Sequence, residues 1–133
     1  MAENGLVTLE SAHNVKDTID RFESGARSAG MTIFARIDHA AGARGVGLAL
    51  RPTELLIFGN PKAGTPLMQS DQTIGIDLPL KALAWENPAG KVWLSYNDPA
   101  WLAGRHGLAD QAGERTKAMA AALAALSKQA TSV

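Results

Sequence analysis

Cysteine is absent from this chain of 133 residues, which excludes disulfides and thiolate metal ligands. The chain also lacks an excess of charge of either sign, because 13 Lys and Arg residues balance 13 Asp and Glu residues. A neutral chain without a basic stripe does not attract a polyanion at long range. The composition therefore suits a reducing compartment and gives no reason to expect a nucleic-acid partner.

Long apolar runs are missing as well. No stretch approaches the roughly 18 apolar residues that a membrane-spanning helix requires, and the start, MAENGLVTLES, lacks the charged and then apolar pattern of a signal peptide. We therefore expect a cytoplasmic chain with no membrane partner, although a chain whose signal peptide had been removed would look the same. The length fits a single domain over residues 1–133.

Local patterns predict the secondary structure. Alternating apolar residues and short β-branched runs predict about five strands, over residues 6–9, 31–38, 54–58, 80–86 and 92–96. Capping residues and helical spacing predict helices that start after Asn14, after Asp38, at Thr65-Pro66, after Asp98 and at Glu114. The last residues, 128–133, are expected to fray.

The order of these elements indicates the fold class. Strands and helices do not alternate strictly enough for a doubly wound parallel sheet. We therefore expect an α+β fold, a two-layer single domain with a mixed sheet of about five strands and helices packed on it. The first helix should bury one face, since its apolar residues recur at helical spacing: Val15, Ile19, Phe22 and Ala26.

The segment GNPKAGTPLM, residues 59–68, interrupts the apolar pattern directly after a predicted strand. Thr65-Pro66 pairs a capping side chain with proline at the first helical position. Free N–H groups at a helix N-terminus beside a lysine can bind a carboxylate or phosphate. We predict a site here for a small anionic molecule with an apolar body, formed by Gly59, Asn60, Lys62, Gly64, Thr65 and Trp101. The alternative is that these residues only cap their helix and turn the chain.

Two histidines lie at the ends of predicted elements. His39 follows Asp38, and this carboxylate and imidazole are candidates for acid and base chemistry. His106 is a further catalytic candidate, and the two imidazoles together are candidate ligands of a metal or haem iron. The structural alternatives are that Asp38 caps a helix and that His106 stabilises a helix C-terminus. Without HExxH, CxxCH or clustered carboxylates we expect no metal site, and the cofactor stays unknown.

Two long phrases carry a resemblance to a known family. They are FARIDHAAGARGVGLALRPTELLIFGNPKAGTPLMQ and IGIDLPLKALAWENPAGKVWLSYNDPAWLAGRHGL. Together they resemble the bacterial and archaeal family called domain of unknown function 302, over about residues 5–127. The resemblance implies a compact α+β fold of the kind first described for a Thermus protein, often a homodimer, with no established reaction.

Two classes of function remain open. The first is a dimeric ligand-binding or regulatory module with its site at the turn over residues 59–66. The second is a small enzyme that uses Asp38 and His39 as an acid and base pair. The first is favoured, because each candidate polar residue also has a structural role. A homodimer is expected from the resemblance and from three tryptophans in so small a domain, Trp85, Trp93 and Trp101.

Overall fold

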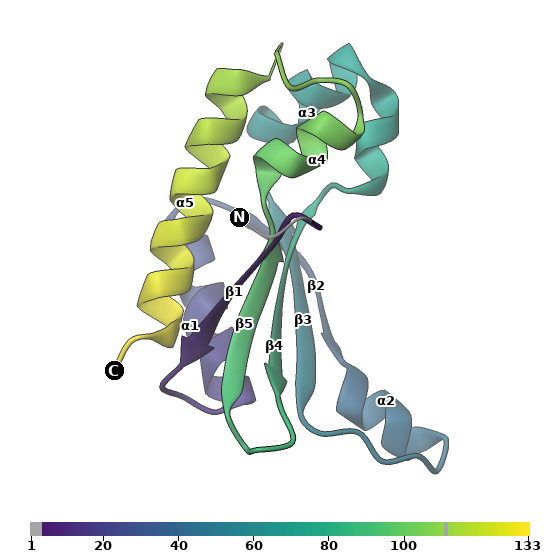
Figure 1. The fold of residues 1–133 in the computed structure, drawn as a ribbon, viewed down its shortest axis with the longest axis vertical. Coiled ribbons are helices and arrows are strands. Elements are labelled where there is room, and N and C mark those ends of the chain that lie inside the picture. Colours follow the sequence, from purple (N-terminus) through teal and green to yellow (C-terminus); the bar gives the residue numbers. More distant parts are fainter. Residues whose placement is uncertain (1–3, 111) are drawn as a thin grey trace.

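The computed structural model describes residues 4–110 and 112–133. The chain forms one α+β domain in which a single sheet is covered by helices (Figure 1). In chain order, its elements are β1 (Leu6–Ser11), α1 (Val15–Ser28), β2 (Thr32–Asp38), α2 (His39–Gly45), β3 (Thr53–Gly59), α3 (Pro61–Ser70), the short 3-10 helix η1 (Gln72–Ile76), β4 (Leu80–Glu86), β5 (Val92–Asn97), α4 (Pro99–Arg105) and α5 (Gly113–Thr131).

The sheet has five strands in the order β1-β5-β4-β3-β2. The predicted α+β class and strand number are confirmed, but the prediction of a mixed sheet was wrong, because every neighbouring pair is antiparallel. The physical reason lies in the first crossover. α1 carries the chain from β1 at one edge to β2 at the other, so these two strands never pair and no parallel ladder forms.

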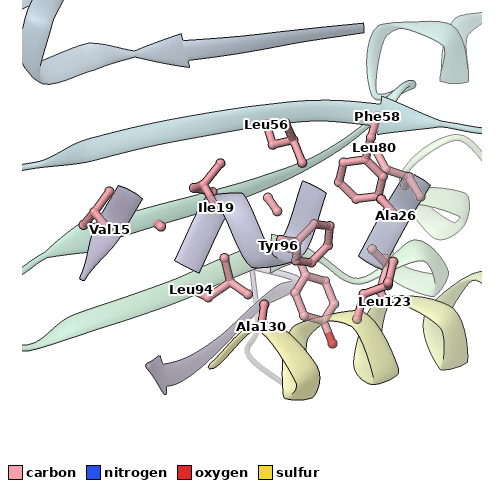
Figure 2. Packing of buried hydrophobic residues seen from close by; sticks show 14 of the residues in the cluster. Val15, Ile19, Ala26, Leu56, Phe58, Leu80, Leu94, Tyr96, Leu123 and Ala130 are labelled. Atoms are coloured by element: carbon pink, nitrogen blue, oxygen red, sulfur yellow. The ribbon is translucent and has the colours of Figure 1, made fainter. Parts of the chain in front are cut away.

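The core lies between the sheet and α1. Asn14 begins this helix as predicted, since its Oδ1 accepts the Asp17 N–H at 2.7 Å. The predicted apolar face is buried, and the ring of Phe22 packs against Phe58 of β3 with centroids 5.0 Å apart. Figure 2 shows how side chains of α1, the strands and α5 meet in this cluster.

The C-terminal helix α5 packs along α1. Residues 128–133, expected to fray, continue α5 as far as Thr131, and Ala130 is buried. Arg21 of α1 donates to the carbonyls of Gln129 and Ala130, at 2.8 and 3.1 Å. These contacts, which satisfy carbonyls of the last turn, hold the end of α5 against the domain.

The two long helices α1 and α5 lie on the same side of the sheet (Figure 1). The opposite side carries a set of half-buried apolar residues, which we call the open sheet face: Leu55, Ile57, Leu83, Trp85 and Trp93. The two tryptophan rings stack with centroids 6.3 Å apart. Within the described residues, no helix is long and apolar enough to cross a membrane.

Candidate functional site

A cleft of about 650 Å³ lies beside α3, between the sheet and α5. This volume falls within the range of about 300 to 1,000 Å³ that is typical of small-molecule sites. The walls come from the start of β2, the end of β3, α3, the segment before β4, and α5. They are formed by Met31, Phe34, Gly59, Asn60, Pro61, Lys62, Ala63, Gly64, Thr65, Met68, Leu78, Pro79, Leu80, Arg115, Ala118, Met119 and Ala122.

Most of the ligand-binding residues named from the sequence line this cleft. They are Gly59, Asn60, Lys62, Gly64 and Thr65. The exception is Trp101, which is not among the lining residues. Its ring instead packs over Gly5, where a Cβ would approach the ring to 2.4 Å. Gly5 also has a φ of +76°, a backbone conformation that favours glycine. The close ring and the backbone conformation therefore each require glycine at this position.

The first turn of α3 differs from the sequence expectation. The helix starts at Pro61 with Asn60 as its cap, and Thr65-Pro66 lies inside it. The side chain of Asn60 accepts the Lys62 N–H at 3.0 Å, while its carbonyl accepts the N–H groups of Ala63 and Gly64. Because Asn60 already takes these three donors, they are not available to an anion.

Charge at the cleft comes from side chains instead. Lys62 of α3 and Arg115 of α5 both line it and are exposed. Neither forms an ion pair with any residue that the structure describes. The described lining includes no Asp or Glu. The cleft therefore offers positive charge that no carboxylate of its own walls neutralises.

The remaining wall is largely apolar and adaptable. Met31, Met68 and Met119 line the cleft from three different parts of the chain. Phe34 also lines it, and 51% of its surface is exposed. Methionine side chains adjust their shape at little cost, so such a wall fits apolar groups of varied outline. An exposed phenylalanine in this position presents a ring face that a ligand can cover.

Asp38 and His39 are placed away from the cleft. Asp38 caps α2, because its Oδ1 accepts the Ala41 N–H at 2.9 Å. His39 is exposed at the start of the same helix, and no hydrogen bond joins the two side chains in the described structure. Figure 1 places α2 and α4 at opposite ends of the molecule, so His39 and His106 do not meet. This arrangement does not favour the acid and base pair or a metal shared by both imidazoles.

His106 instead belongs to a side-chain cluster that sequence reasoning missed. Its Nε2 lies 2.5 Å from Asp77 Oδ2, and its Nδ1 lies 3.0 Å from Thr73 Oγ1. Arg105 Nη1 donates to both oxygens of Asp77, at 3.0 and 2.9 Å. We call Thr73, Asp77, Arg105 and His106 the Asp77 cluster. It joins η1 and the following segment to the end of α4.

Asp71 is a further carboxylate beside this cluster, and its Oδ1 accepts hydrogen bonds from Thr73. Hydrogen bonds from the Thr73 hydroxyl and backbone N–H, with a contribution from the charge of His106, lower the pKa of Asp71 below its usual range. None of these residues lines the cleft, although Leu78, next to Asp77, does. Across residues 4–110 and 112–133, no three His, Asp or Glu side chains group as metal ligands.

Comparison with known proteins gives relatives of greater length. A protein of Brucella suis named "Fluoride-specific ion channel FluC 1" is 55% identical over 128 residues, covering 96% of this chain and 50% of that protein. A Brucella abortus protein of the same name is 55% identical and is covered to 47%. The chain thus spans about half the length of the curated relatives it matches.

A solved structure matches the fold over almost the whole chain. It is the uncharacterized conserved protein DUF302 from Bacillus stearothermophilus, with a TM-score of 0.83 and 20% sequence identity, covering 95% of this chain and 98% of that one. The family model described as "Domain of unknown function DUF302" matches residues 7–126. The chain therefore belongs to the family of domain of unknown function DUF302.

Proposed function

We propose that this domain binds a small molecule with an apolar body and an anionic end in the cleft beside α3. The observation that carries the proposal is the combination of an apolar wall with two cationic side chains in one cleft of about 650 Å³. Small-molecule sites have this composition, a mostly apolar lining with a few polar groups that fix orientation.

The apolar part of the ligand would contact the methionines and Phe34. Burial of apolar surface contributes about 25 cal/mol per Å², so this contact supplies most of the affinity. Bare phosphate or fluoride uses none of that wall. A carboxylate or sulfate joined to a hydrocarbon or aromatic body suits the cleft better.

The anionic end would pair with Lys62 and Arg115. These side chains come from α3 and α5, so a ligand that contacts both would connect the two helices. Each pair, being exposed, contributes no more than about 1 kcal/mol. The cations therefore select for charge and orientation rather than provide the bulk of the affinity.

Thermal unfolding with decanoate and with decanol tests the proposal. The two compounds share an apolar chain and differ in charge, so we expect decanoate to raise the Tm more than decanol. Arg115→Gln should reduce this difference, because it removes one cation from the cleft. Lys117→Gln is the matched control, since Lys117 is exposed on the same helix but does not line the cleft.

Three results would count against the proposal or a part of it. If neither compound changes the Tm at concentrations below its micelle formation, the cleft is not a site for this class. If Arg115→Gln and Lys117→Gln reduce the decanoate shift equally, the compound binds through general charge rather than in the cleft. Equal shifts with decanoate and decanol would limit the site to apolar recognition.

We propose as a second candidate that the domain regulates an ion channel. The observation in its favour is the 55% identity to half of proteins that are named fluoride-specific ion channels. In that role, a ligand in the cleft would signal to the channel rather than undergo a reaction. Deleting the gene for this chain should then change the fluoride sensitivity of its host, and unchanged growth across a fluoride series would argue against the role.

A further inference from the structure

The segment from α2 to the start of β3, residues 39–52, extends from one end of the molecule (Figure 1). We call it the α2 arm. It has three large aliphatic side chains exposed to solvent within five consecutive positions, Val46 at 73%, Leu48 at 66% and Leu50 at 49%. Every residue from 44 to 52 is exposed. Such a concentration of exposed aliphatic surface marks a site of contact with another surface.

The α2 arm has little packing of its own to explain these residues. Within α2, the buried residue is Ala40. A Cβ placed on Gly42, Gly45 or Gly47 would meet no atom within 4 Å. Gly47 has a φ of +78°, where the chain turns after α2. The glycines of the arm therefore have no neighbouring atoms to pack against, and its exposed aliphatic side chains do not belong to a core.

The charge of the arm is one-sided. Residues 39–52 contain Arg44 and Arg51 but no Asp or Glu, whereas the chain as a whole is neutral. Neither arginine forms an ion pair within the part of the chain that the structure describes. The partner of the arm should therefore present both apolar groups and negative charge.

We propose that the α2 arm docks on an anionic phospholipid surface. Val46, Leu48 and Leu50 would insert among the acyl chains, and Arg44 and Arg51 would contact the phosphates. Apolar insertion combined with basic side chains is the usual chemistry of peripheral membrane binding. The expectation of no membrane partner rested on the lack of a spanning segment, which this mode of binding does not need.

A second copy of the chain suits the arm less well. The open sheet face is mostly apolar and also carries charges of both signs, Lys81 opposite Ile57 and Glu10 opposite Trp93, so it is the surface that better matches an identical partner. Two arms brought together would place four arginines near one another without carboxylates from the arms to pair them. A lipid surface supplies those anions.

Sedimentation with vesicles tests the proposal on the whole chain. We expect binding to vesicles of phosphatidylcholine mixed with phosphatidylglycerol, and much weaker binding to phosphatidylcholine alone. Replacing both arginines, as Arg44→Gln with Arg51→Gln, should lower the partition coefficient about 25-fold, because each cation near an anionic surface contributes about fivefold. Replacing the three aliphatic residues by serine should lower it more than tenfold.

The matched control is Ile76→Ser. Ile76 is 73% exposed, as is Val46, but belongs to η1, which packs against α3 at the other end of the molecule (Figure 1). This substitution should leave vesicle binding unchanged. Circular dichroism and the Tm of each variant check that the fold is retained.

Two outcomes would overturn the proposal. The first is that the unsubstituted chain stays in the supernatant with both kinds of vesicle. If the serine variant then turns a dimer into a monomer in light scattering, the arm contacts a second copy. The second is that Ile76→Ser weakens vesicle binding as strongly as the arm substitutions, which would show that binding depends on general surface hydrophobicity.

Discussion

The Nε2 atom of His106 lies 2.5 Å from Asp77 Oδ2, and this contact joins α4 to the segment that follows η1. Both carboxylate oxygens of Asp77 also accept from Arg105 Nη1, so one carboxylate contacts two side chains at the C-terminal end of α4. The neighbouring Leu78 lines the cleft. The Asp77 cluster thus stabilises one wall of the cleft without contributing a side chain to it.

Asp77→Asn should destabilise the domain. The amide keeps the size of the side chain but loses the charge that Arg105 and His106 contact, and hydrogen bonds to charged groups contribute about 1.5 to 3 kcal/mol. We expect a loss near the lower value, about 1.5 kcal/mol, because Arg105 is half exposed. The denaturant midpoint measures it, with exposed Asp110→Asn as the control. Equal midpoints for the two variants would show that the cluster does not stabilise the fold.

The sequence predicted those features whose geometry depends on residues close together in the chain. The Asn14 cap, the buried face of α1 and the turn between β4 and β5 all depend on contacts within a few residues. In that turn, Asn87 Oδ1 accepts the N–H groups of Ala89 and Lys91, and Gly90 has a φ of +81°. The cap and the buried helix face were predicted in place, and the predicted strands over residues 80–86 and 92–96 flank this turn.

The errors came from contacts between distant residues or from repeated local signals. Asn60-Pro61 and Thr65-Pro66 both pair a capping side chain with proline, so the local sequence does not distinguish them as helix starts. In the structure β3 ends at Gly59, and the helix therefore starts at the first pair. Asp77 and His106 are 29 residues apart, so no local pattern links them. Trp101 was predicted to line the site as an aromatic side chain of the helix after Asp98, but its neighbour Gly5 comes from the start of the chain.

Asn60→Ala should cost about 1 kcal/mol of stability, because it removes the acceptor of the Lys62 N–H. Asn60→Asp retains an acceptor at the same position and should cost much less. Urea unfolding compares the two variants. If alanine leaves the midpoint unchanged, the side chain has no structural partner, and a role in ligand contact becomes the better explanation.

Acid should weaken the contact between α1 and β2. Hydrogen bonds from Lys16 and then Arg36 lower the pKa of Asp20 below its usual value of 3.8. Because the folded pKa is the lower one, the carboxylate contributes stability above pH 3.8 that is lost as the pH falls through the folded value. Asp20 is 42% exposed, so the contribution is a few tenths of a kcal/mol.

Asp20→Asn gives the measurement for this contact. The free energy of unfolding of the variant should be slightly below that of the parent chain at neutral pH, and the two should converge as the pH falls below 3.8. A constant difference at every pH would mean that the asparagine acts through packing rather than through lost charge.

We expect the chain to form a homodimer through the open sheet face. Ile57 and Leu83 lie half buried on neighbouring strands of this face, beside the stacked pair Trp85 and Trp93. Lys81 lies opposite Ile57 and Glu10 opposite Trp93 on this face, so its charges balance and the face can match a second copy across a two-fold axis. Ile57→Lys should therefore give a monomer in light scattering, whereas Ile76→Lys, exposed elsewhere, should not. Monomer mass for the unsubstituted chain over a wide range of dilution would exclude the dimer.

Filling the cleft should prevent ligand binding without loss of the fold. Ala122 of α5 lines the cleft and is half buried, so Ala122→Phe places a ring in the space that the apolar part of a ligand would occupy. Ala121 precedes it but is exposed and does not line the cleft, which makes Ala121→Phe the matched control. A ligand at a hundred times its Kd adds about 2.7 kcal/mol of stability. We expect the control to keep the Tm shift with decanoate and Ala122→Phe to lose it. If both variants keep the shift, decanoate binds elsewhere, and the assignment of this cleft as the ligand site is wrong.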